Sequence, residues 1–117
     1  MKLILSAHNA QDSEAIEAHI KARLEKFSHY ESEAIEARVL IEHDSTKAPD
    51  RAYKCAMRLA VPGPDLFAEE SREDLYVAID TVSKKIEQQI RTRHSKRNSK
   101  NHSEAARLKE ERQNENL

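Results

Sequence analysis

The chain has 117 residues, of which 35% are charged and only 4% aromatic, so we expect a small core under a highly charged surface and no large ligand cavity. No apolar run approaches the ~20 residues needed to span a bilayer. The only cysteine, Cys55, excludes an internal disulfide framework and a cysteine-based zinc cage. The N-terminal apolar stretch is too short for a signal peptide, so we expect a cytoplasmic protein without membrane contact.

The formal net charge of −1 conceals a strong asymmetry along the chain. Residues 84–100 carry seven basic side chains against Glu87 alone, a local charge of +6, whereas residues 1–83 sum to −6. A nearly neutral protein with its cations gathered in one stretch can bind a polyanion there. The overall charge therefore does not exclude nucleic acid as a partner.

The first two predicted elements are a strand and a helix. Residues 2–7 alternate between apolar and polar positions, which is typical of a strand. Residues 13–29 follow with a helical apolar stripe, and Asp12 or Ser13 can cap this helix. The stripe consists of Ile16, Ile20, Leu24 and Phe27, and the side chains on one of its flanks are His19, Arg23 and Lys26. Taken alone, this flank is interpreted as solvated.

Three further strands are predicted at residues 34–43, 51–61 and 65–70. The first two alternate, and the side chains expected to face the core are Ile35, Ala37, Val39, Ile41, Tyr53, Cys55, Met57, Leu59 and Val61. The strongest turn signal, Pro62-Gly63-Pro64-Asp65, precedes the last strand. In that strand Leu66 and Phe67 are adjacent, so only one of them can point inward, and the sequence does not decide which.

The longest predicted element is a helix that begins near residue 72, with Ser71-x-x-Asp74 as its cap. Its apolar stripe is Leu75, Ile79, Val82, Ile86 and Ile90, and on the same side further along lie Arg93, Arg97 and Lys100. A helix that continues so far would overhang its sheet, and its buried stripe would become cationic. This end is either a solvated helix terminus or a basic arm for phosphates. We favour the arm because only one acid accompanies the cations.

The order β-α-β-β-β-α predicts an α+β fold, a four-stranded sheet with both helices packed on one face. We expect this domain to cover residues 1–96 and a charged flexible tail to cover residues 97–117. The few aromatic side chains are expected to point inward where they can be placed. We therefore do not expect stacking of unpaired bases. We expect contacts to the shape and backbone of folded RNA instead.

The sequence contains no pattern typical of an active site or a cofactor site. A single glycine excludes a phosphate loop, the six histidines are scattered, and the carboxylates lie on exposed faces. Cys55, between Tyr53 and Met57, is interpreted as a packed apolar residue. We expect no enzymatic activity, no cofactor and no metal.

The segment Glu73-Asp74-Leu75-Tyr76-Val77-Ala78-Ile79-Asp80, followed by Lys85-Ile86-Glu87-x-Gln89-Ile90, resembles a family motif, roughly D-[LM]-Y-x-A-I-[DN] and then K-L-x-R-Q-L. The family is that of ribosome hibernation-promoting factors and ribosome-associated inhibitors, also called the sigma-54 modulation family. The resemblance covers about residues 1–96 and implies a fold like that of double-stranded-RNA-binding domains. It also implies a bacterial stress or stationary-phase factor, a monomer off the ribosome. Such a factor occupies the messenger and transfer RNA channel of the small ribosomal subunit (16S rRNA), near the decoding centre, and thereby inhibits translation.

The candidate RNA-binding residues come from the resemblance and from the charge pattern together. The resemblance assigns Arg23, Lys26, Lys85 and Gln89, and the basic stretch adds Lys84, Arg91, Arg93, Lys96 and Arg97. The motif residues Asp74, Tyr76, Ala78, Ile79 and Asp80 are assigned to folding and capping. Two departures are Gln88, where the family usually has arginine, and Glu70, where a small residue is common.

The length leaves no room for the second, dimerising domain of the long family forms, so we expect a short form. Some short forms promote ribosome dimers together with a separate ribosome modulation factor, whereas short forms with a tail oppose dimerisation. The sequence does not decide between these two behaviours. Two other functions remain as alternatives, a generic structured-RNA-binding module and a protein-interaction modulator of transcription.

Overall fold

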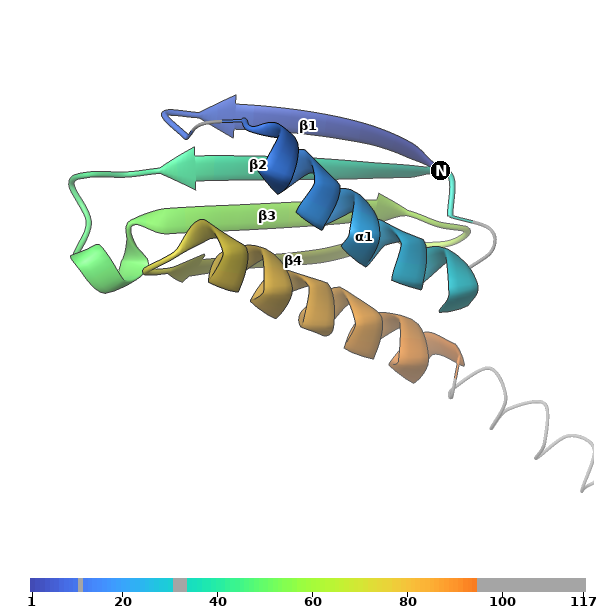
Figure 1. Ribbon diagram of the computed structural model, residues 1–117. Helices are drawn as coiled ribbons and strands as arrows, with labels where there is room; N and C mark the ends of the chain where they lie inside the picture. Colours follow the sequence, from blue (N-terminus) through green and yellow to red (C-terminus); the bar gives the residue numbers. More distant parts are fainter. Residues whose placement is uncertain (11, 31–33, 95–117) are drawn as a thin grey trace, which may run out of the picture.

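The computed structural model describes residues 1–10, 12–30 and 34–94 (Figure 1). The predicted tail, residues 97–117 with Arg97 and Lys100, lies outside these residues, and so does Lys96 at the end of the predicted domain. The elements in chain order are β1 (Lys2–His8), α1 (Glu14–Tyr30), β2 (Glu36–His43), the short 3-10 helix η1 (Pro49–Arg51), β3 (Tyr53–Ala60) and β4 (Leu66–Arg72). A second helix covers residues 75–94, where the described chain ends.

The four strands form one mixed sheet in the order β1-β2-β3-β4. The first two strands are parallel, and the other two pairs are antiparallel. Parallel neighbours need a crossover connection, and α1 provides it between β1 and β2. Both helices cover the same face of the sheet (Figure 1), which confirms the predicted α+β architecture.

The first helix forms where its cap and stripe predict it. The Ser13 hydroxyl oxygen accepts a hydrogen bond from the backbone N–H of Ile16 (3.2 Å), so Ser13 satisfies one free donor of the first turn. The predicted stripe is buried, and Phe27 is only 1% exposed. The apolar side of α1 therefore packs onto the sheet.

The core lies between the sheet and the two helices. The sheet side chains buried in it are Ala37, Val39, Ile41, Cys55, Met57, Leu59, Leu66 and Ala68, and those of the second helix are Leu75, Ala78, Ile79, Val82, Ile86 and Ile90. Burial raises the pKa of the Cys55 thiol to about 12, because an apolar environment disfavours the thiolate. Cys55 is thus a packed apolar residue, as the sequence indicated.

The strand register decides which of the adjacent residues Leu66 and Phe67, at the start of β4, faces the core. Leu66 is buried and contributes to the core, whereas Phe67 is 42% exposed. Since side chains alternate along a strand, Phe67 and Glu69 lie on the face away from the helices. The structure thus decides the orientation that the sequence left open, with Leu66 inward and Phe67 outward.

Two predicted boundaries are also wrong. The second helix begins at residue 75 rather than near 72, because β4 continues to Arg72, which pairs with Tyr53. Asp74 alone caps it, and its Oδ1 accepts from the backbone N–H groups of Tyr76 (2.7 Å) and Val77 (3.4 Å). Ile35, predicted to face the core, is 70% exposed because regular β2 begins only at Glu36 and the inward alternation does not extend to residue 35.

Candidate nucleic-acid interface

The described candidate residues of the second helix lie on two flanks of its buried stripe. Side chains three or four positions apart share one side of a helix. We call the side toward α1 the interhelical flank, made of Asp80, Lys84, Glu87 and Arg91, and the side toward β4 the strand flank, made of Lys85, Gln89 and Arg93.

Asp80 anchors the interhelical flank to α1. Its Oδ1 accepts hydrogen bonds from His19 Nε2 (2.7 Å) and Arg23 Nε (2.9 Å), and Arg23 Nη2 lies 2.8 Å from the same oxygen in an ion pair. The ring of Tyr76 meets the His19 imidazole edge-on, with 5.0 Å between the ring centroids. Arg23, predicted to bind RNA, thus also ties the two helices together.

Two other candidate cations on these two helices are Lys26 and Lys84. Both are exposed, and within the described chain neither takes part in an ion pair. Arg91 is also exposed and donates from Nη2 to Glu87 one turn earlier (2.9 Å). We call four basic side chains of the two helices the interhelical surface: the partly buried Arg23 and the exposed Lys26, Lys84 and Arg91. Arginine and lysine are the residues that neutralise phosphates, so this surface can contact a nucleic-acid backbone.

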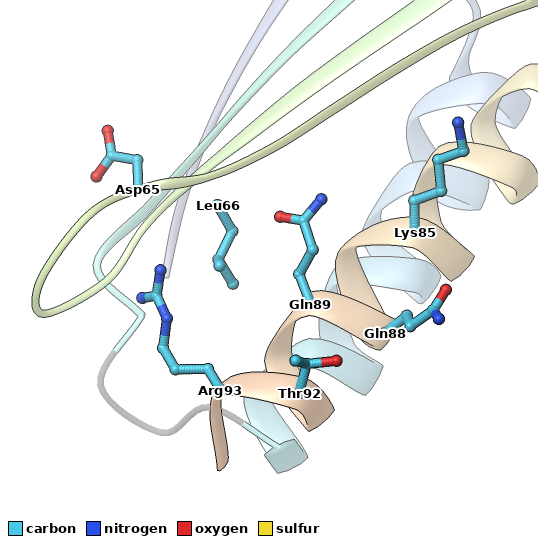
Figure 2. A pocket seen from close by; sticks show the side chains of 7 residues that line it. All are labelled: Asp65, Leu66, Lys85, Gln88, Gln89, Thr92 and Arg93. Carbon is cyan, nitrogen blue, oxygen red and sulfur yellow. The ribbon is translucent and has the colours of Figure 1, made fainter. Parts of the chain in front are cut away.

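The strand flank lies along the last strand and the turn before it (Figure 2), and each of its three side chains is hydrogen-bonded there. Lys85 Nζ donates to Glu70 Oε1. The Gln89 amide donates to the Phe67 carbonyl (2.8 Å) and accepts from the Phe67 N–H (3.3 Å). Arg93 donates from Nη2 to the Pro64 carbonyl (2.7 Å) in the turn between β3 and β4. The predicted overhang is therefore wrong at Arg93, where the helix still lies against its own domain.

Glu70 explains the position of Lys85. It takes the inward register of β4 after Leu66 and Ala68, and its side chain is only 16% exposed. The hydrogen bond from Lys85 holds the pKa of Glu70 below its ordinary value, and the charge of Arg72, whose Nη1 lies 2.7 Å from Glu70 Oε2, lowers it further. A carboxylate at a position where a small residue is common thus has two cationic partners, which offset the cost of its partial burial.

A groove of about 550 Å³ runs between the strand flank and β4. Figure 2 shows Gln89 and Arg93 directed toward the strand, whereas Gln88 and Thr92 lie on the outer side of the helix. Asp65 and Leu66 form the opposite wall. The cations of this groove already have acceptors within the protein, so an incoming phosphate would have to compete for them.

The sequence located the cations but not their acceptors. Asp80 lies 57 residues from Arg23 and 61 residues from His19 along the chain, and no local spacing links such distant positions. The only available signal was the helical wheel, which placed His19, Arg23 and Lys26 together on one flank of α1. The structure joins Arg23 to Asp80 across the two helices, and helical spacing groups Lys26, Lys84 and Arg91 with this contact. Lys85, Gln89 and Arg93 are instead directed to the last strand and the turn before it.

Metal clusters and membrane-spanning helices are both absent from residues 1–10, 12–30 and 34–94. No group of three or more histidine, cysteine, aspartate or glutamate side chains in this part of the chain could hold a metal ion. No helix in it is long and apolar enough to cross a membrane.

Residues 3–98 match the model of a protein family described as sigma 54 modulation protein / S30EA ribosomal protein. Among curated proteins, the chain is 30% identical over 87 residues to a ribosome hibernation promotion factor from Deinococcus radiodurans, covering 74% of this chain and 46% of that protein. It is 29% identical over 92 residues to a protein of the same name from Picosynechococcus, covering 78% and 48%. The chain thus spans about half the length of these curated relatives.

Two solved structures share the fold. The N-terminal domain of Protein Y from Thermus thermophilus superposes with a TM-score of 0.66 at 23% identity, covering 77% of this chain and 96% of that domain. A ribosomal subunit interface protein from Coxiella burnetii superposes with a TM-score of 0.66 at 15% identity, covering 81% and 99%. At these identities the likeness concerns the fold alone.

Proposed function

We propose, because the chain belongs to the sigma 54 modulation protein / S30EA ribosomal protein family, that it is a ribosome hibernation factor. In this proposal it binds the small ribosomal subunit under stress or in stationary phase. There it occupies the channel for messenger and transfer RNA near the decoding centre and inhibits translation. The observation that carries the proposal is the family match over residues 3–98, together with relatives named ribosome hibernation promotion factors.

The proposed mechanism is occupancy and needs no chemical step, so we do not propose an enzyme. The protein would act in the cytoplasm, as a monomer before it binds, and its main partner would be 16S rRNA. Cations that neutralise RNA phosphates release counterions, which makes binding strong at low salt and weak at high salt. The interhelical surface supports this mechanism because its basic side chains come from two helices that lie side by side on the sheet (Figure 1). A separate ribosome modulation factor would be a further partner where ribosome dimers form.

The bonds within the protein suggest an order of importance among the RNA-binding candidates. Lys26 and Lys84 are exposed and need not give up an ion pair with another described residue to contact a phosphate. Lys85 and Arg93 would have to exchange or share their present acceptors, Glu70 and Pro64. We therefore assign the largest contributions to Lys26 and Lys84 and smaller ones to the other candidates.

Sedimentation of purified small subunits through a sucrose gradient, with and without the protein, tests the proposal. The wild-type protein should sediment with the subunits at low salt and dissociate as salt rises. The double variant Lys26→Glu, Lys84→Glu should bind at least tenfold more weakly, and its salt slope should fall by about 2. A matched control is Lys21→Glu, Lys47→Glu, which changes the net charge equally at exposed lysines outside the interhelical surface.

Three results would contradict the proposal or its mechanism. Equal sedimentation of the Lys26, Lys84 double variant and the wild type would exclude the electrostatic mechanism. An RNA duplex bound as tightly as the subunit would indicate a generic structured-RNA-binding module. Capture of a transcription factor from nuclease-treated lysate, without ribosome binding, would indicate a modulator of transcription.

A further inference from the structure

The two helices leave one face of the sheet uncovered (Figure 1), and the strand register places one row of side chains across all four strands on this face. The register pairs Ile4 with Arg38, Arg38 with Arg58, and Arg58 with Phe67. We call these four residues the open-face row. The row holds two cations and two apolar side chains, and no carboxylate belongs to it.

The two arginines of the row stand directly opposite each other in an antiparallel pair. Like charges in this position destabilise a sheet. Both side chains are well exposed, and their carboxylate partners lie outside the row, Glu36 at 3.0 Å from Arg38 and Asp65 at 3.7 Å from Arg58. These ion pairs reduce the repulsion in part, and since each guanidinium has five N–H donors, donors remain that an incoming anion can share with the carboxylates.

Phe67 is an exposed aromatic ring at the end of the row, held in place from both sides. Its backbone N–H and C=O are both bonded to the Gln89 side chain, which fixes this edge of β4. The guanidinium carbon of Arg58 lies 5.1 Å from the ring centroid. Gln89, a candidate RNA-binding residue, thus also positions Phe67.

The row borders a groove of about 370 Å³ on this face. Ile4, Leu40 and Ala56 contribute apolar surface, and the two arginines line the same hollow. This volume is within the ~300–1,000 Å³ of small-ligand sites. Neighbouring strands are ~4.8 Å apart, so the backbone positions of Phe67 and Arg38, two strands apart, are separated by ~10 Å. Along this distance the aromatic ring comes first and the two guanidinium groups follow. A ligand with a flat apolar group next to an anionic group would match this sequence of a ring and two cations.

We propose that the open face binds single-stranded RNA, with one base stacked on Phe67 and the adjoining phosphate held by Arg58 and Arg38. Stacking on an aromatic ring beside cations is the usual means of binding unpaired nucleotides. The proposal rests on the proposed function, since it assumes an RNA-binding factor, and it adds a second RNA contact on the side opposite the helices. An acidic peptide would meet the same arginines but would not require the ring, which is why the observations favour RNA.

Fluorescence anisotropy with a labelled single-stranded hexauridylate tests this inference. Phe67→Leu keeps an apolar side chain and removes the ring, so we expect binding about tenfold weaker. Phe67→Tyr restores the ring and should bind within about twofold of wild type. Arg58→Gln should weaken binding and lower its salt dependence. Tyr76→Leu removes an equally exposed ring from the helical side (39% against 42%) and should have no effect.

Small-subunit sedimentation of the same variants separates this inference from the proposed function. If the wild type sediments with subunits but does not bind hexauridylate, or binds it as well after Phe67→Leu, the inference is wrong and the proposed function stands. If neither assay shows binding, the proposed function is wrong as well. If hexaglutamate displaces the oligonucleotide and also binds the Phe67→Leu variant with unchanged affinity, the face is a protein site and the inference is wrong.

Discussion

The two flanks of the second helix each carry one lysine and one arginine, but these cations have different surroundings. The strand flank has Lys85, Gln89 and Arg93, and each of them has an acceptor on β4 or on the turn before it. On the interhelical flank Asp80 holds α1, while Lys84 is exposed to solvent. A cluster of cations along a helix is therefore not a single binding surface, because what each cation can bind depends on the acceptors that the fold places beside it.

The largest expected effect comes from the apolar stripe between the flanks. Ile86 is fully buried, so Ile86→Ala should lower the free energy of unfolding by ~2–5 kcal/mol and weaken both flanks together. Urea denaturation measures this loss. Val77→Ala, on the exposed side of the same helix, should stay within ~0.5 kcal/mol of wild type. A loss below ~1 kcal/mol for Ile86→Ala would mean that the helix contributes little to the core.

The second effect concerns the anchor of the interhelical flank. Asp80→Ala leaves Arg23 and His19 without their shared acceptor, and we expect a loss of ~1–2 kcal/mol in the free energy of unfolding. Asp80→Asn keeps a neutral acceptor and should lose less. Equal losses in the two variants would show that the negative charge, rather than the hydrogen bonds, holds the helices together.

Adjacent lysines of the same helix give the sharpest comparison of the flanks. Lys84→Gln should weaken small-subunit binding about fivefold and leave stability unchanged, because this lysine has no described ion pair to lose. Lys85→Gln removes the same charge but also the partner of Glu70, so it should affect stability more and binding less. The distinction between the flanks would fail if the two variants lost equal affinity with unchanged stability.

The strand flank can be tested through its neutral member. Gln89→Ala removes both hydrogen bonds to the Phe67 backbone and should cost ~0.5–1 kcal/mol. The neighbouring Gln88→Ala, on the outer side of the helix, is the matched control and should be neutral. Amide hydrogen exchange at Phe67 should quicken only in the Gln89 variant, and unchanged protection would argue against the bond.

The smallest effect is a pH dependence. Because the folded-state pKa of Glu70 lies below its ordinary value, its stabilising contribution is complete at neutral pH. The contribution decreases as the pH falls through the ordinary value, ~4.3, toward the lower folded-state value. Unfolding curves of wild type and Glu70→Gln should differ by less than ~1 kcal/mol at pH 7 and converge near pH 3. A difference that grows with acidity would contradict the assigned direction.

Most of the fold was predictable because it depends on local patterns. The stripe of α1, the alternation of β3 and the stripe of the second helix each repeat with the period of one element, and each is buried as expected. The start of the second helix was not predictable in this way. Ser71 and Asp74 are both good capping residues, and only the pairing of Ser71 with Lys54 in the sheet decides between them.

The candidate site was predictable in composition but not in arrangement. The sequence by itself determined the element order, the buried stripes and the presence of cations near the second helix, because burial and periodicity are properties of short segments. Only the tertiary structure decided that Lys85, Gln89 and Arg93 are bonded to the sheet and that Phe67 stands exposed beside Arg58. These contacts join residues distant in sequence, and their geometry exists only once strand register and helix packing are fixed.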